Sequence, residues 1–228
     1  MKRAINQSMK QNLHKTLVST ALLAALGGAA QAQASDAKNV IFFLGDGMGP
    51  SVVTAARIYQ YKEEGSLTMD TLERTARIKT FSNDAQTTDS APSMAAYMTG
   101  VKMNNEVISM SAETSAFDAT GKDYLSGTDS TCPASGNGSA VTTLLELAKS
   151  AGRSTGAVTT TRVTHATPAA TYAHICNRNG ENAIAAQAVP GGVGYNSALG
   201  TGLDVLLGGG TDHFLPTSLG GKRTDGRD

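Results

Sequence analysis

KNVIFFLGDGMG, residues 38–49, joins an unbroken apolar run to an aspartate that stands between two glycines. Continuous apolar runs of this kind are typical of strands buried on both faces, as in parallel sheets. The glycines carry no side chains, so other groups can approach Asp46 closely. The stretch therefore predicts a buried strand over residues 38–44 that presents Asp46 at its carboxyl end.

Strand and helix patterns alternate through the rest of the chain. Further strands are predicted over residues 76–82, 154–162 and 203–207, and helices over residues 51–64, 91–98, 139–150 and 183–189. Gly100 and Gly152 follow two of these helices and are typical stop signals. The polar segment 101–138 lacks periodicity and is predicted to run over the surface. The alternation predicts an α/β fold with a largely parallel sheet.

Composition limits the classes of protein to consider. The 228 residues allow one or two domains, and 40% hydrophobic residues are enough for a core. Lys and Arg total 19, as do Asp and Glu, so the net charge is zero. A neutral chain argues against a nucleic-acid-binding protein that is attracted by bulk charge.

Residues 1–34 have the layout of a secretory signal peptide. A basic start precedes the apolar run 17–30, and two overlapping Ala-x-Ala sites follow. The run is shorter than the roughly 20 residues that span a bilayer, so no membrane span is expected after cleavage, although an uncleaved anchor is the alternative. Export makes Cys132 and Cys176 candidates for a disulfide, but the sequence leaves open whether they pair.

Several chemically capable side chains follow the predicted strands. Because the carboxyl ends of parallel strands share one edge of the sheet, these residues are expected to converge there: Asp46, Asp89, Ser90, His165, Thr167 and Arg178. Such a set can handle a phosphate with metal ions. Each member also has a plain structural reading: a turn aspartate, a helix cap, ordinary loop residues or a solvated arginine.

Four motifs make the chain resemble the alkaline phosphatase family from residue 38 to residue 228. They are NVIFFLGDGMG with the following TAARI, TTDSAPSMAAYMTG, GAVTTTRVTHATPAATYAHICNRN and DVLLGGG. The resemblance implies a three-layer α/β sandwich with a largely parallel central sheet. It also implies two Zn²⁺ ions and one Mg²⁺ ion as cofactors.

The resemblance assigns roles residue by residue. Ser90 matches the serine that becomes phosphorylated, with its oxygen bound to zinc during attack, and Asp89 would orient the arginine that binds phosphate. Asp46 matches an aspartate ligand shared between a zinc and the magnesium, and Thr167 matches a hydroxyl ligand of the magnesium.

Two further residues complete the set that the resemblance implies. Arg178 matches the phosphate-binding arginine, whose planar fork suits two oxygens at once. His165 stands where family members vary between Asp and His, so it would act on magnesium through water. His174 and His213 are interpreted as structural, and the remaining metal ligands are expected beyond residue 228.

The implied function is metal-dependent hydrolysis of phosphate monoesters through a phosphoserine intermediate. Residues 35–228 are expected to be the N-terminal part of the catalytic domain, inactive alone, from a periplasmic or secreted homodimer. Two alternatives stay open. In the first, the chain is a truncated, non-catalytic module that binds phosphate or metal. In the second, the protein is a related metallohydrolase, a phosphodiesterase or a sulfatase.

Overall fold

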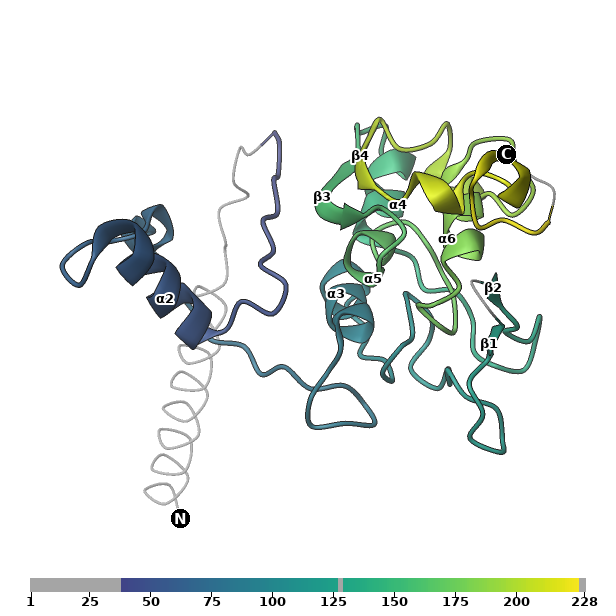
Figure 1. Cartoon of the computed structure of the whole chain (residues 1–228), viewed down its shortest axis with the longest axis horizontal. Coiled ribbons are helices and arrows are strands. Elements are labelled where there is room, and N and C mark those ends of the chain that lie inside the picture. Colours follow the sequence, from purple (N-terminus) through teal and green to yellow (C-terminus); the bar gives the residue numbers. More distant parts are fainter. Residues whose placement is uncertain (1–37, 127–128, 226–228) are drawn as a thin grey trace, which may run out of the picture. The chain divides into compact units, whose positions relative to one another are not determined.

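The computed structural model describes residues 38–126 and 129–225 (Figure 1). The predicted signal peptide and its cleavage sites lie outside the described residues. Within the described ranges, no helix is long and apolar enough to cross a membrane. The chain divides into two units between Gly45 and Asp46, and the second unit carries all the helices and strands described below.

Helices and short strands alternate along the second unit. Its α-helices are α2 (Pro50–Tyr61), α3 (Ser90–Thr99), α4 (Leu144–Ser150), α5 (Ala166–Ala169) and α6 (Glu181–Ala188). Its strands are β1 (Leu125–Ser126), β2 (Asp129–Ser130), β3 (Gly156–Arg162) and β4 (Val205–Gly209). Short 3₁₀ turns are η1 (Thr68–Thr71), η2 (Ser197–Leu199), η3 (Thr211–His213) and η4 (Thr217–Leu219).

Strands β3 and β4 form a parallel pair, which agrees with the predicted parallel sheet. Gly156 pairs with Val205 and Val158 with Leu207, and the register shifts before Arg162 pairs with Gly209. Helix α6 follows β3 along the chain and precedes β4, so the connection is of the strand–helix–strand type that parallel strands require. The predicted strands at residues 154–162 and 203–207 are thus confirmed within two residues.

The core lies among α3, α5, α6 and the segment between α3 and β1. Small side chains allow the close contact of α3 with α5: Ala91, Ala95, Ala166 and Ala169 are all at most 1% exposed. Tyr172 is also fully buried, and its hydroxyl donates to the carbonyl of Val163 at 2.8 Å. A polar end that finds a partner allows a tyrosine to lie in the interior.

Residues 101–116 are not a surface excursion, so the prediction is wrong for this part of the segment 101–138, whereas residues 117–125 and 129–138 are all exposed or half-buried. Met103, Val107 and Ile108 are fully buried. Ile108 and Ile175 exchange both backbone hydrogen bonds, at 2.9 and 3.0 Å. The buried residues stand singly or in pairs within polar sequence. They therefore produce no periodic hydrophobic pattern that would predict their burial.

Two predicted strands are absent from the structure. Residues 38–44 and 76–82 have no strand assignment, and Val40, Phe43 and Ile78 are 83%, 88% and 64% exposed. A strand buried on both faces needs hydrogen-bonded neighbours and covering layers. Among the described residues, no strand pairs with either segment, so their apolar sequence alone does not form a strand here.

Local capping explains where the helices begin and end. α4 starts later than predicted because Thr143 and Glu146 form a reciprocal capping box, with Thr143 N donating to Glu146 Oε2 at 2.7 Å. Gly100 ends α3 in the left-handed conformation (φ 74°), as predicted. The predicted helix over 51–64 is observed as α2, and the one over 183–189 as α6.

Cys132 and Cys176 form a disulfide, with Cα atoms 5.9 Å apart. The pairing that the sequence left open is therefore made. The bond ties the chain just after β2 to the segment that carries Arg178, 44 residues further along.

Candidate active site

The N-terminus of α3 carries both Asp89 and Ser90. Asp89 is the N-cap, and its Oδ2 accepts a hydrogen bond from Ala91 N at 3.3 Å. Ser90 is the first residue of the helix, where unpaired backbone N–H groups and the helix dipole favour an anion. Asp89 therefore caps the helix, and the neighbouring Ser90 is free to take the chemical role.

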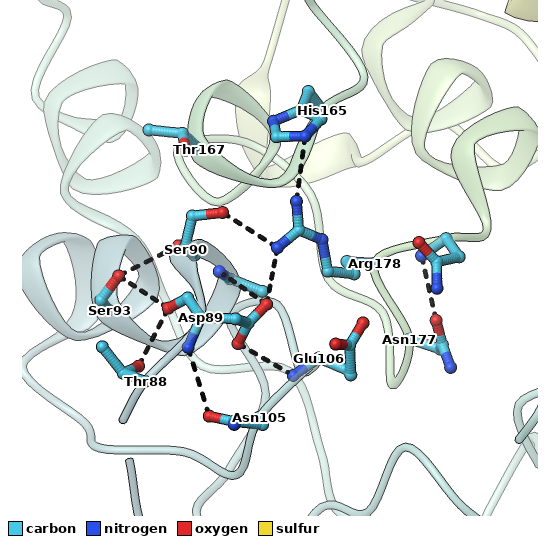
Figure 2. A network of polar contacts seen from close by, with 12 residues as sticks. Thr88, Asp89, Ser90, Ser93, Asn105, Glu106, His165, Thr167, Asn177 and Arg178 are labelled. Atoms are coloured by element: carbon cyan, nitrogen blue, oxygen red, sulfur yellow. Dashed lines mark hydrogen bonds and ion pairs between the residues drawn. The ribbon is translucent and has the colours of Figure 1, made fainter. Parts of the chain in front are cut away.

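Arg178 joins these two residues through one guanidinium nitrogen. Its Nη1 donates to Asp89 Oδ2 at 2.6 Å and to Ser90 Oγ at 2.9 Å (Figure 2). The side chains of Arg178 and Asp89 are only 15% and 21% exposed. A charge-assisted bond with so little access to water fixes the direction of the guanidinium toward the serine oxygen.

His165 contacts the other edge of the same guanidinium. Arg178 Nη2 donates to His165 Nε2 at 3.0 Å, so this nitrogen acts as an acceptor (Figure 2). Burial lowers the pKa of His165, and the positive charges of Arg178 and Arg162 lower it further. A neutral imidazole is the form that can accept from arginine.

Asp46 and Thr167 form a second polar pair. Thr167 Oγ1, on α5, donates to Asp46 Oδ2 at 2.7 Å. Carboxylate and hydroxyl oxygens are ligands that suit Mg²⁺, so the chemistry of this pair fits a magnesium site. Within residues 38–126 and 129–225, no group of three or more His, Cys, Asp and Glu side chains could hold one ion.

Glu181 connects the segments that carry the site residues. Its carboxylate accepts two bonds from Arg162, both at 2.7 Å, and a third from Thr164 Oγ1 at 2.5 Å. Thr164 immediately precedes His165, and Glu181 lies three residues after Arg178. One carboxylate therefore holds the end of β3 to the start of α6, which fixes the segment before His165 relative to the segment after Arg178.

Sequence reasoning missed two residues around the site, Glu181 and Glu106. Glu106 N donates to Asp89 Oδ1 at 3.1 Å, and Glu106 O accepts from Arg178 N at 2.8 Å. Neither residue lies in a recognisable motif. An acidic residue in the first turn of a helix was the one available signal for Glu181, and it points only to helix stability.

The other two histidines of the described residues have interior partners. His174 Nδ1 lies 2.7 Å from the carbonyl of Ser109, and its Nε2 lies 2.7 Å from Glu146 Oε1. His213 is 2% exposed and contacts Asn182 Oδ1 at 3.0 Å. Both agree with a structural role.

The geometry around Ser90 and Arg178 is that of an oxyanion-binding site. A serine oxygen at a helix N-terminus, beside a desolvated arginine, suits an oxyanion such as phosphate. The alkaline phosphatase family profile matches residues 37–228, which is most of the chain. The chain belongs to the alkaline phosphatase family.

Curated relatives and solved structures agree with that assignment. The human tissue-nonspecific alkaline phosphatase is 41% identical over 192 residues, which cover 79% of this chain and 34% of the relative. An alkaline phosphatase from Gadus morhua is 38% identical over 216 residues, covering 84% and 42%. The chain thus spans less than half the length of these relatives.

The fold neighbours are alkaline phosphatases as well. The enzyme from the Antarctic bacterium TAB5 has a TM-score of 0.54 at 27% identity, covering 78% of this chain and 40% of that one. The cold-active enzyme from Shewanella sp. has a TM-score of 0.53 at 31% identity, covering 78% and 37%. The α/β class is confirmed, with a small parallel sheet and helices that correspond to part of the family fold.

Proposed function

We propose that the protein hydrolyses phosphate monoesters through a phosphoserine intermediate on Ser90. The observation that carries this proposal is the pair of hydrogen bonds from Arg178 Nη1 to Ser90 Oγ and Asp89 Oδ2. A phosphoryl group bound here meets the nucleophile, a guanidinium fork and the positive end of a helix. All three stabilise negative charge on phosphate oxygens.

Each residue of the site has a separate role in the proposed reaction. Ser90 Oγ forms a bond to phosphorus and its proton passes to solvent. The bond from phosphorus to the leaving oxygen breaks, and this oxygen keeps the electron pair and takes up a proton from solvent, so the alcohol departs. Arg178 stabilises the serine oxygen as it loses its proton and then binds the phosphate oxygens. Asp89 and His165 hold the two edges of the guanidinium in place. Water then attacks phosphorus, which releases inorganic phosphate and restores Ser90.

We propose one Mg²⁺ and two Zn²⁺ ions as cofactors. Asp46 and Thr167 would hold the magnesium, because they offer paired oxygen ligands. Bound metal ions supply positive charge that activates the nucleophile and stabilises the leaving oxygen. Residues 38–126 and 129–225 do not by themselves form a zinc site. A structure of a TAB5 enzyme variant, 25% identical to this chain, is described with Mg bound in its M3 site.

We further infer where the chain belongs in the whole protein. Residues 1–34 would direct export, and residues 35–228 would form the N-terminal part of the catalytic domain of a homodimer. The disulfide Cys132–Cys176 supports a periplasmic or secreted location, because such bonds persist in oxidising compartments.

A second candidate is a phosphate-binding module without turnover. The serine, the arginine and its two positioning residues are assembled, whereas the described residues hold no three-ligand metal group. The 228-residue chain on its own is therefore expected to bind phosphate without hydrolysing its esters.

Comparative hydrolysis separates these candidates. The protein purified from its native host, with zinc and magnesium supplied, is assayed on an aryl phosphate, a phosphodiester and a sulfate ester. Fast release from the monoester alone supports the proposal, and Arg178→Ala should lower kcat/KM by roughly 10²–10³-fold. Glu113→Ala, at an exposed carboxylate, is the matched control and should be neutral. Faster diester or sulfate hydrolysis would contradict the proposal, and phosphate binding without hydrolysis would favour the module.

A further inference from the structure

Glu106 has a backbone conformation that glutamates rarely adopt. Its φ is 70°, in the left-handed region where glycine is favoured. Of the described residues, two other non-glycines also have positive φ: Lys62 ends α2, and Ser109 is fully buried with Oγ donating to the carbonyl of Ala170. Glu106 is the one that lies at the candidate site. Strained backbone that persists at a site points to function.

The backbone of Glu106 contacts both residues that surround Ser90. Its N–H donates to Asp89 Oδ1 at 3.1 Å, and its carbonyl accepts from Arg178 N at 2.8 Å. In Figure 2 the Glu106 side chain lies close to Arg178 and Asp89. Burial raises the pKa of its carboxyl group, the Asp89 charge raises it further, and the Arg178 charge opposes both. The Glu106 charge is therefore coupled to the charges of both residues.

We propose that the Glu106 carboxylate weakens the binding of phosphate at the Ser90–Arg178 site, an inference that rests on the proposed function. A glycine at position 106 would make the same two backbone hydrogen bonds without the strain. These bonds therefore do not explain why a glutamate side chain is present. The carboxylate adds a negative charge to a site built for a doubly charged anion. Repulsion of inorganic phosphate favours release of the product, and product release limits turnover in many enzymes.

Titration calorimetry with inorganic phosphate tests the proposal on the 228-residue chain at pH 8 with magnesium present. Glu106→Gln removes the charge and keeps the left-handed backbone, so it should bind phosphate about three- to tenfold more tightly at about 20 mM salt. The gain should shrink at about 0.5 M salt, where charges are screened. Glu106→Gly should bind as tightly as Glu106→Gln and also raise Tm, because it relieves the positive φ. Glu113→Gln removes an exposed carboxylate and should change nothing.

The outcomes separate this inference from the proposed function. Loss of binding in Arg178→Ala, with no gain in Glu106→Gln, overturns the inference and leaves the proposed site intact. A gain in Glu106→Gly without one in Glu106→Gln assigns the effect to backbone strain and also overturns it. Binding that survives Arg178→Ala, or no binding by any variant, overturns both.

Discussion

Replacing Glu146 with alanine should destabilise the fold by about 3–5 kcal/mol, the usual cost of leaving the partner of a buried ion pair alone. The Glu146 side chain is 4% exposed. It accepts hydrogen bonds from His174 Nε2 at 2.7 Å, Asn196 Nδ2 at 2.6 Å and Thr143 N at 2.7 Å. Truncation to alanine leaves His174 Nε2 and Thr143 N without this acceptor and removes one of the two acceptors of Asn196 Nδ2. It also removes the half of the α4 capping box that the Glu146 side chain supplies.

The same contacts predict a pH dependence. Burial alone would raise the pKa of Glu146, but the bonds from His174, Asn196 and Thr143 outweigh it and lower the pKa to about 2. One unit of pKa is worth about 1.4 kcal/mol, so ionised Glu146 contributes about 3 kcal/mol. That contribution is present above the ordinary pKa of glutamate and is lost as the pH falls toward 2.

His174 makes the stability of the fold depend on pH at higher pH values than Glu146 does. Burial lowers its pKa, yet the bonds to Glu146 and to the Ser109 carbonyl outweigh burial, so its pKa is raised overall. A raised histidine pKa stabilises the fold below the ordinary value of about 6.5 and loses that effect as the pH rises through the folded pKa. The pair should therefore contribute most between about pH 5 and pH 6.5.

Urea denaturation of the oxidised chain at several pH values measures both effects. Glu146→Gln should lose less stability than Glu146→Ala but should flatten the pH profile, because the amide keeps a polar group without the charge. Glu113→Ala serves as the control at an exposed carboxylate. A loss below about 1 kcal/mol for Glu146→Ala, or an unchanged profile for Glu146→Gln, would show that the Glu146–His174 pair does not stabilise the fold as described.

Three further perturbations follow from the same structure. Asp89→Ala should remove the N-cap of α3 and deprive Arg178 of its carboxylate partner, for a loss of about 2–4 kcal/mol in thermal or urea unfolding; a neutral result would contradict the cap assignment. Cys132→Ala with Cys176→Ala should cost about 4 kcal/mol in the unfolding free energy, given the 44-residue separation, and reduction of the parent chain should match it. Glu181→Ala should break the bidentate pair with Arg162, whose side chain is 42% exposed, and cost about 1–2 kcal/mol; equal unfolding midpoints for the variant and the parent would show that this network contributes nothing.

Local sequence signals predicted several of the elements that position the site. Gly100 predicted the end of α3, and the alternation of strand and helix patterns predicted β3 and β4 as strands of a largely parallel sheet. These features depend on nearby residues, on capping and on turn chemistry. Such properties can be read within a window of about ten residues.

The remaining features depend on long-range partners that local patterns do not reveal. Residues 38–44 have strand-like sequence, but β structure requires a neighbouring strand, and none pairs with them among the described residues. Burial of Met103 and Ile108 depends on contacts made far along the chain, including the bridge to Ile175. Glu106 and Glu181 act through contacts with residues 17 or more positions away, so neither lies in a motif that a local pattern could identify.

The most direct test of the central claim is to trap the phosphorylated enzyme. The protein from its native host is mixed with a phosphate monoester, quenched in acid and digested with trypsin, which cuts after Lys79 and Lys102. We expect one added phosphoryl group on the peptide of residues 80–102, located at Ser90 and absent from Ser90→Ala. Turnover without a phosphorylated peptide, or a phosphoryl group at another residue, would contradict this claim.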